Sequence, residues 1–492
     1  MRIGFLAMTL KIFMKKKSKL LIIVAVLLVV AAGAVAAVRW RQNYVPQIQS
    51  FVTKETVQQF TQSTAETSAV QQVLGYGTPR TYLVLLLNNT ELRPGGGFIG
   101  AYAVVQFNEG VPKLLKIEGT EILDNSAPYF VTTTPPDPLK KYLQIPYWQF
   151  RDSNWSPDFS SSAVKALDLF RRENGTAANN IDGVAAFTPT VMEELLKITG
   201  PITVDGQQWT SSNFTDQLEY EVEYGYAGHG LSFNDRKQTL IDLAHAILPR
   251  IAGDVFQHWS DYTALFPRML AQKQIALYSI RPAEEAIMAQ KQWGGLMNGA
   301  PGDYLMWVDA NLGSLKTDAV MERSLSYAIK PASSTYVGTV TMRLVNKGTI
   351  TWRTTRYRDY ARVYVPSGSI LLGATGAMVK EGSTAPGTID QGQENGRQWF
   401  GAFIDVEPGA AGALSFQFEL APSVVAQIKS KHYTLLAQKQ IGTLAPLLTL
   451  GLEFGDEVIF GHPGEPIAKH GDSRYDLVTD LSVDREFTVG LK

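Results

Sequence analysis

The sequence predicts a chain of mixed class: a layered α/β domain with a mixed sheet, followed by an all-β sandwich and preceded by a single N-terminal transmembrane helix. Three observations support this prediction. An uncharged apolar run fills residues 20–38, strand-like and helix-like patterns alternate over 76–330, and short alternating segments separated by Gly, Pro and Ser fill 331–492. With 45% hydrophobic and 18% charged residues, the chain is neither disordered, nor collagen-like, nor a polytopic membrane protein.

The apolar run from Leu20 to Val38 is long enough for one membrane span. Its 19 residues reach about 28 Å as a helix, close to the thickness of a hydrocarbon core. Basic residues are more numerous before the run than after it, so the positive-inside rule predicts that residues 1–19 are cytoplasmic and the bulk of the chain is extracellular. A cleaved signal peptide is the competing interpretation, because the Ala-Val-Ala at 34–36 resembles a cleavage site, but the run exceeds the usual apolar core of such peptides.

Charge and cysteine content exclude several classes of function. The whole chain sums to −1 and residues 1–41 contribute eight positive charges and no acid, so the remainder carries −9. This acidic remainder argues against nucleic acid as a partner. Because the chain has no cysteine, a disulfide, a thiol nucleophile and a cysteine-ligated metal are all excluded.

Helix and strand patterns define the α/β domain. Residues 39–75 predict a helical stalk, because apolar side chains recur at helical spacing in a polar, Gln- and Thr-rich segment. In the β-α-β unit that follows, Thr188 is a natural N-cap, Pro189 suits the first helical position, and Gly200 stands where a helix-ending glycine belongs. The elements expected in the domain are strands at 81–88, 98–107, 113–118, 181–187, 202–204, 274–279 and 304–309, and helices at 162–174, 188–198, 235–248, 252–271 and 282–292.

After Pro331 the segments are short, alternating or β-branched. This pattern predicts a β-sandwich module with a strand-like tail. The strands expected in it lie at 336–346, 361–365, 398–404, 414–420 and 433–438.

The glycine-rich segment Gly95–Gly100 formally matches G-x-G-x-x-G. A dinucleotide site needs a helix directly after this motif, whereas here an extended apolar run follows. We therefore expect a tight turn against a closely approaching backbone. Zinc-hydrolase, P-loop, nucleophile-elbow and EF-hand patterns do not occur, which disfavours those classes.

Three polar clusters are the candidate functional residues: 88–93 after an apolar strand, 151–159 before a helix, and 234–238 at another helix start. Each has a structural alternative, since Asp158 and Asp235 can cap helices and Arg93 and Arg151 can form structural ion pairs. The candidates are Asp152 and Asp158 for catalysis and Asn89, Glu91, Arg93, Arg151, Asn154, Asp235, Arg236 and Gln238 for substrate binding.

The same segments resemble the signature of a bacterial family of unknown function, DUF4012. The matching stretches are Asn88–Gly100, Arg151–Phe159, Ile181–Pro189, Trp307–Asp318, Tyr357–Pro366 and Leu435–Gln440. The resemblance spans nearly the whole chain and implies an anchored envelope protein without an assigned activity.

A weaker resemblance has chemical content. The order of elements and the segment N-D-R-K-Q-T-L, with Arg236 and Gln238 in it, are similar to the LytR-CpsA-Psr phosphotransferases. Those enzymes transfer glycopolymers from polyprenyl-pyrophosphate carriers, with arginines on the pyrophosphate and acidic residues on Mg²⁺. The chain departs from their pattern at 117–121 and 228–230, so either the anionic site has moved or the fold is kept without catalysis.

Two hypotheses follow. In the first, the protein is anchored in the membrane and lies outside the cytoplasm, in the cell envelope. It binds a phosphorylated or anionic envelope glycopolymer or the polyprenyl-phosphate carrier of that polymer, and in one variant of the hypothesis it also transfers the polymer. Arg93, Arg151 and Arg236 would hold phosphate, while Asp152 and Asp158 would hold Mg²⁺, the one candidate cofactor, or act as base. In the second, the protein is a non-catalytic surface scaffold or adhesion protein. Convergence of the three clusters in one cleft would favour the first hypothesis.

Overall fold

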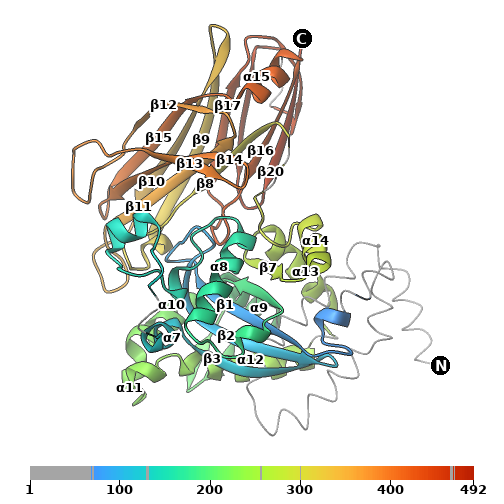
Figure 1. The fold of residues 1–492 in the computed structure, drawn as a ribbon, viewed down its shortest axis with the longest axis vertical. Helices are drawn as coiled ribbons and strands as arrows, with labels where there is room; N and C mark the ends of the chain where they lie inside the picture. The colour runs from blue at the N-terminus through green and yellow to red at the C-terminus, as the bar shows by residue number, and fades with distance from the viewer. Residues whose placement is uncertain are drawn as a thin grey trace, which may run out of the picture.

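The computed structural model describes residues 68 and 71–492, except 129–131, 255–256, 298, 300, 466–468 and 470. The predicted cytoplasmic tail, the membrane span at 20–38 and most of the stalk lie outside the described residues. Within the described part of the chain, no helix has the length and apolar character needed to cross a membrane. Figure 1 shows two parts, an α/β part in blue to yellow-green and a β-rich part in yellow to red.

A five-stranded sheet forms the centre of the α/β part, in the order β3-β2-β1-β4-β7. Only the β1–β4 pair is parallel, so these two strands end at the same edge of the sheet. Asn88 ends β1 and Thr188 follows β4 at that edge. The strands are β1 (Arg80–Asn88), β2 (Phe98–Asn108), β3 (Val111–Gly119), β4 (Gly183–Phe187) and β7 (Ile275–Ser279).

Helices cover both faces of this sheet, which explains the continuous apolar run in β1. Leu83 and Leu85 pack with α8 (Phe159–Arg172) on one face, whereas Val84 packs on the other face among α9, α12 and α13. Side chains alternate between faces along a strand, so a strand covered on both sides reads as uniformly apolar. The other three helices are α9 (Pro189–Thr199), α12 (Gln238–Asp254) and α13 (Trp259–Ala271).

Helix α9 confirms the predicted helix boundaries, whereas the strand after it, β5 (Ile202–Val204), pairs only with β6 (Gln207–Trp209) in a separate two-stranded sheet. Thr188 is the N-cap residue of α9, Pro189 is its first residue, and Gly200 follows it with φ of 74°. The Thr188 hydroxyl, however, donates to Gln274 Oε1 at 2.6 Å instead of capping the helix. The shorter helices of the described chain are α7 (Thr120–Ser126), α10 (Phe214–Tyr220), α11 (Tyr226–Gly228), α14 (Pro282–Gln290) and α15 (Pro422–Lys429).

Two sheets packed around one apolar core form the β-rich part. The six-stranded sheet has the order β12-β15-β10-β9-β17-β19 and the seven-stranded sheet the order β13-β14-β11-β8-β16-β20-β18. The chain therefore combines an α/β part with a β-rich C-terminal part, as predicted. The strands are β8 (Asp303–Val308), β9 (Met321–Ala332), β10 (Thr335–Asn346), β11 (Tyr357–Pro366), β12 (Ile370–Thr375), β13 (Asp390–Glu394), β14 (Arg397–Val406), β15 (Ala411–Glu419), β16 (His432–Gln438), β17 (Leu447–Glu453), β18 (Val458–His462), β19 (Arg474–Asp480) and β20 (Arg485–Leu491).

The β-rich part begins earlier in the chain than the composition change at Pro331. Strand β8 pairs with β11 and β16, and β9 pairs with β10 and β17. The predicted boundary at 330 therefore falls inside β9, and the division between the two parts precedes β8. The strand near 304–309 is buried throughout, and such a strand has the same apolar pattern in either kind of sheet.

Candidate functional site

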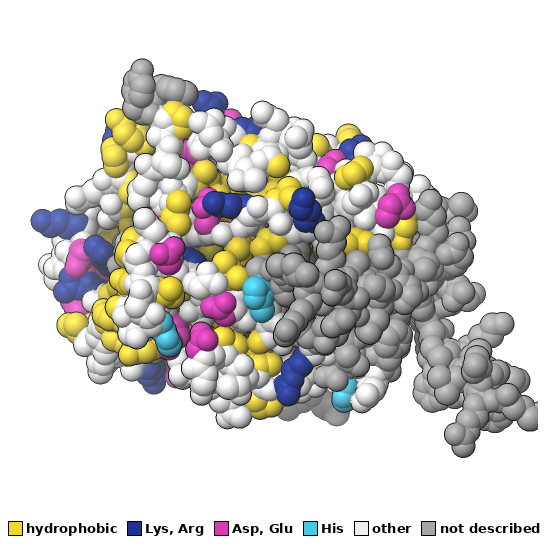
Figure 2. Space-filling model, turned by 90° about the horizontal axis from the view of Figure 1, so that it is seen from below, with side chains coloured by type: hydrophobic (Ala, Val, Ile, Leu, Met, Phe, Trp, Pro, Cys, Tyr) yellow, Lys and Arg dark blue, Asp and Glu magenta, His cyan; other side chains and the backbone are white. Residues whose placement is uncertain are grey.

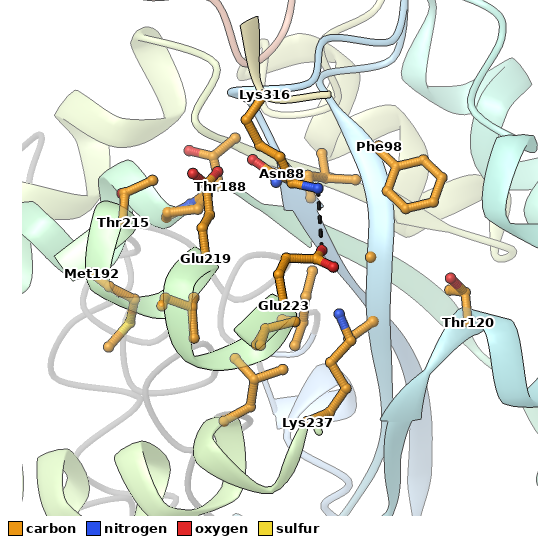
Figure 3. A pocket seen from close by; sticks show the side chains of 18 of the residues that line it. Asn88, Phe98, Thr120, Thr188, Met192, Thr215, Glu219, Glu223, Lys237 and Lys316 are labelled. Atoms are coloured by element: carbon orange, nitrogen blue, oxygen red, sulfur yellow. Dashed lines mark hydrogen bonds and ion pairs between the residues drawn. The ribbon is translucent and has the colours of Figure 1, made fainter. Parts of the chain in front are cut away.

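A pocket of about 180 Å³ opens at the edge where β1 and β4 end (Figure 3). The strands supply its inner wall, and α9, α10 and the beginning of α12 supply the opposite side. This is the place where open α/β sheets usually build their sites. Its apolar lining consists of Leu86, Leu87, Phe98, Ala101, Phe187, Pro189, Met192, Phe214, Leu218, Val222 and Leu240.

Charged side chains surround this apolar interior. Arg236 pairs with Glu121 at 2.8 Å and with Glu223 at 3.3 Å. Lys316 reaches the other oxygen of Glu223 at 3.1 Å, the pair drawn as a dashed line in Figure 3. Burial raises the pKa of a carboxyl group, yet the pKa of Glu223 is lowered because Lys316 and Arg236 outweigh that effect.

Arg151 is the third paired cation of the pocket. Its Nε donates to Asp124, whose side chain is fully buried. Burial raises the pKa of Asp124 and that of its neighbour Glu173, the latter to about 9. At neutral pH this pair of carboxyl groups therefore holds a proton, and Arg151 faces one negative charge instead of two.

Lys237 differs from these three cations. Within the described residues it makes no ion pair and no side-chain hydrogen bond, although it lines the same pocket. Its Nζ would lie 3.9 Å from a Cβ placed on Gly100 of β2, and Figure 3 shows the amine directed into the pocket. Burial lowers the pKa of Lys237 to about 8. The pocket thus holds an ammonium group that makes no ion pair of its own, because the nearby carboxylates of Glu121 and Glu223 pair with Arg236 and Lys316.

Residues 77–223 match the family described as "Protein of unknown function (DUF4012)". The matched segment covers less than half of the chain and supports the predicted resemblance to DUF4012 there. It includes β1, β2, α9 and α10, which form most of the pocket. Lys237 and Lys316 lie outside it.

Other comparisons add no function. No curated protein matches the chain. Among solved structures, the Listeria innocua protein Lin1025 matches at 11% identity over 43% of this chain and 77% of its own, with a TM-score of 0.24. A putative nutrient binding protein from Legionella pneumophila matches at 7% identity over 39% and 72%, also at 0.24. Leukotriene A4 hydrolase from Saccharomyces cerevisiae matches at 14% identity over 35% and 28%, at 0.22.

The predicted binding residues converge only in part. Arg151 and Arg236 both line this pocket, together with Asn88 from the first cluster. Asn89 points elsewhere and donates to Thr190 at 3.2 Å and to the carbonyl of Gly442 at 3.1 Å. Asp235 accepts from Ser232 at 2.5 Å, and Gln238 donates to Asp242 at 3.1 Å.

Arg93, Glu91 and Asp152 form a buried ion cluster. Arg93 is 3% exposed, and its Nε donates to Asp152 at 3.1 Å while Nη2 reaches Glu91 at 3.3 Å. Its Nη1 donates to the carbonyl of Asn311 at 2.6 Å. All three guanidinium nitrogens of Arg93 therefore bind other groups of the protein. Arg93 thus forms the structural ion pair that was the alternative to phosphate binding.

Asp158 and Asn154 also have structural contacts. One Asp158 oxygen caps α8 by accepting from the Ser161 amide, and the other accepts from the Met297 amide, both at 2.9 Å. Asn154 donates to the carbonyl of Gly97 at 2.7 Å. No group of three or more His, Asp or Glu side chains within the described residues is placed to hold a metal ion. The catalytic and Mg²⁺ roles predicted for Asp152 and Asp158 thus have no geometric support.

Residues of the first polar cluster and of the glycine-rich segment instead join the two parts of the chain. The amide of Leu92 donates to Asp318 at 2.9 Å, and Gln440 donates to the carbonyl of Arg93 at 3.2 Å. A Cβ on Gly442 would lie 1.9 Å from the carbonyl oxygen of Gly96. The turn against a close backbone that the glycines predict is therefore found, and the close backbone belongs to the β-rich part.

Sequence reasoning missed most of the pocket. Residues 214–223 received no predicted element, although they form α10 and the π-helical turn after it, with Glu219 and Glu223 in the pocket. Lys237 stands inside the predicted cluster at 234–238. The signal that distinguishes it from Arg236 is the absence of a partner, which only the folded arrangement reveals.

Proposed function

We propose that the pocket binds the phosphorylated end of a polyprenyl carrier lipid, in a membrane-anchored extracytoplasmic protein of the cell envelope. The observation that supports this function is the unpaired Lys237 in an apolar pocket. An isoprenoid segment suits the apolar lining, since its burial contributes about 25 cal/mol per Å². A phosphate would give Lys237 a direct ion pair, as a charge-assisted contact worth about 1.5–3 kcal/mol.

The charge distribution fits a single anionic head group better than a polyanion. Basic, acidic and hydrophobic side chains are interspersed over the described part of the face of the molecule seen in Figure 2. An extended nucleic acid would require a continuous basic surface. The predicted membrane span would hold the domain close to carrier lipids and so raise their effective concentration.

Binding is proposed ahead of transfer. The resemblance to LytR-CpsA-Psr phosphotransferases is compatible with the ligand, but phosphoryl transfer needs a base or metal ligands at the phosphate. The two predicted candidates, Asp152 and Asp158, are engaged as an ion pair and as a helix cap. These structural contacts of Asp152 and Asp158 favour the alternative function, a non-catalytic surface scaffold, in which such polar residues only stabilise the fold.

A titration with geranylgeranyl monophosphate separates these functions. The full-length protein in detergent should bind it saturably, and geranylgeraniol or inorganic phosphate alone should bind at least about ten-fold more weakly. Gly100→Leu should abolish binding, because Gly100 lies beside Lys237 and a Cβ fits there without a contact under 3.9 Å. Gly373→Leu, a matched change with no neighbour within 4 Å of its Cβ, should bind like the wild type. Absence of saturable binding to the wild type would leave the scaffold function.

A further inference from the structure

Glu173 anchors the turn that carries Arg151. It directly follows α8, is 2% exposed, and its Oε1 accepts from the backbone amide of Phe150 at 2.9 Å. Phe150 is fully buried and begins the short 3₁₀ turn Phe150–Asp152, in which Arg151 is the second residue. One oxygen of Glu173 therefore fixes the backbone from which the Arg151 side chain reaches the pocket.

The other oxygen of Glu173 contacts the carboxyl group that pairs with Arg151. The side chains of Glu173 and Asp124 are hydrogen-bonded to each other. Asp124 Oδ1 and Glu173 Oε2 are both buried, and no other group among the described residues donates to either of them. Because a hydrogen bond between two carboxyl groups requires a proton on one of them, these two oxygens share a proton.

Arg151 keeps part of its guanidinium group for the pocket. Its Nε donates to Asp124, but its two terminal nitrogens make no ion pair or hydrogen bond within the described part of the chain. The Arg151 side chain is 28% exposed and lines the pocket, whereas that of Asp124 is fully buried. Terminal guanidinium nitrogens in this state can bind a phosphate through charge-assisted hydrogen bonds.

We infer that Glu173 is a positioning residue of the anion site, which anchors the turn of Arg151 and, through the proton shared with Asp124, limits the negative charge that this arginine faces. The inference rests on the proposed function, since it assigns the phosphate to Arg151 as well as to Lys237. With the proton in place, the charges of Arg151 and the two carboxyl groups sum to zero, and the free N–H groups can donate to an anion. Loss of the proton changes this sum to −1, which repels a phosphate.

Among the described residues around the two carboxyl groups, the other charged or titratable side chains already have partners. These pairs are Tyr102 on β2 with Glu118 on β3, Asp152 with Arg93, Glu121 on α7 with Arg236, and, on α8, Arg172 with Asp168 and Arg171 with the carbonyl of Ala178. Burial, and then the charge of Asp124, raise the pKa of Glu173 to about 9. The shared proton is therefore held at neutral pH and lost as the pH rises through about 9.

The test compares Glu173→Gln with the wild type, as full-length proteins in detergent, in titrations of geranylgeranyl monophosphate from pH 7 to pH 10. The glutamine amide can donate to Asp124 while its oxygen accepts from Phe150, so the variant reproduces the protonated glutamate at every pH. The two proteins should bind equally at pH 7, and at pH 10 the wild type should bind about ten-fold more weakly than the variant. Lys237 loses its proton in both proteins, so its effect cancels in the ratio of the two affinities.

Glu284→Gln is the matched control. Glu284 is likewise a buried glutamate, 5% exposed, which accepts from the Ser279 hydroxyl at 2.6 Å and does not line the pocket. This variant should follow the wild-type affinity at every pH. The inference would be overturned by a ratio between wild type and Glu173→Gln that stays constant with pH, or by an equal change of the ratio in Glu284→Gln, and Glu173 would then be a purely structural residue.

A measurement without ligand separates this inference from the proposed function. In infrared difference spectra at pH 7, the wild type should show a protonated carboxyl band that Glu173→Gln lacks and that the wild type loses at pH 10. Absence of this band would overturn the shared proton whatever the ligand does. A wild type that shows the band but binds no geranylgeranyl monophosphate would overturn the proposed function together with this inference, whereas binding with a constant ratio would overturn the positioning role alone.

Discussion

Replacing Lys237 by methionine should stabilise the fold and weaken ligand binding at the same time. The methionine side chain keeps most of the apolar stem that packs in the pocket but removes the ammonium group. Because the ammonium group is buried and makes no ion pair of its own, the folded state carries a desolvation cost that the variant does not have. If Lys237 served only to stabilise the fold, the same substitution would lower the stability of the protein.

The magnitude follows from the pKa of Lys237. Burial lowers this pKa from its ordinary value of 10.5 to about 8, which corresponds to a cost of roughly 3 kcal/mol at neutral pH. The unfolded chain binds more protons than the folded chain between pH 8 and pH 10.5, so wild-type stability rises with pH in that window. The increase in the free energy of unfolding that Lys237→Met produces should therefore be complete below pH 8 and shrink as the pH approaches 10.5.

Urea unfolding at pH 7 and at pH 10, with a titration of geranylgeranyl monophosphate at pH 7, measures both effects. Lys113→Met is the control, since Lys113 is exposed on β3. A less stable Lys237→Met variant would show that Lys237 has a partner in the fold. Unchanged affinity for the phosphate would show that the ammonium group does not contact the ligand, and either result would refute the reasoning.

Three further substitutions test the remaining roles. Asp158→Ala should cost about 2–3 kcal/mol of stability, because it removes a helix cap and leaves the Met297 amide unsatisfied; thermal unfolding measures this, and ligand affinity should not change. Gly442→Ala should prevent the two parts from packing, since its Cβ would overlap the Gly96 carbonyl; proteolysis between the parts should then increase. Arg151→Ala should weaken phosphate binding by about 1.5–3 kcal/mol and also lower the unfolding midpoint, because Asp124 loses its cation. Retention of both properties would place Arg151 outside the site.

Local patterns predicted the central strands of the α/β part and several of its helices, but not α7 or α10. The boundaries of α9 follow from Pro189 and Gly200, which act through backbone geometry alone. The division from the β-rich part could not be found in this way, because β8 and β9 differ from central strands of an α/β sheet only in their partners. Strand pairing between distant segments leaves no local signal in a uniformly apolar strand.

The sequence predicted only some of the pocket residues correctly. Arg151 and Arg236 lie in the pocket as expected of arginines at helix starts. Arg93 and Asp152 were predicted on the same grounds, but they are buried together as an ion pair, in which the guanidinium and the carboxylate neutralise each other. Residues far away in the chain decide whether a charged side chain lines a pocket or forms a buried ion pair. Lys237 became recognisable only through the absence of such a partner.

The central claim is that an isoprenoid phosphate occupies the pocket beside Lys237. Photolabelling of the full-length protein with a diazirine-bearing geranylgeranyl phosphate, followed by mass spectrometry of the peptides, tests this most directly. The account predicts labels within residues 86–101, 187–192 and 214–223, and their loss in Gly100→Leu. Labels confined to other segments, or labels that persist unchanged in Gly100→Leu, would contradict it.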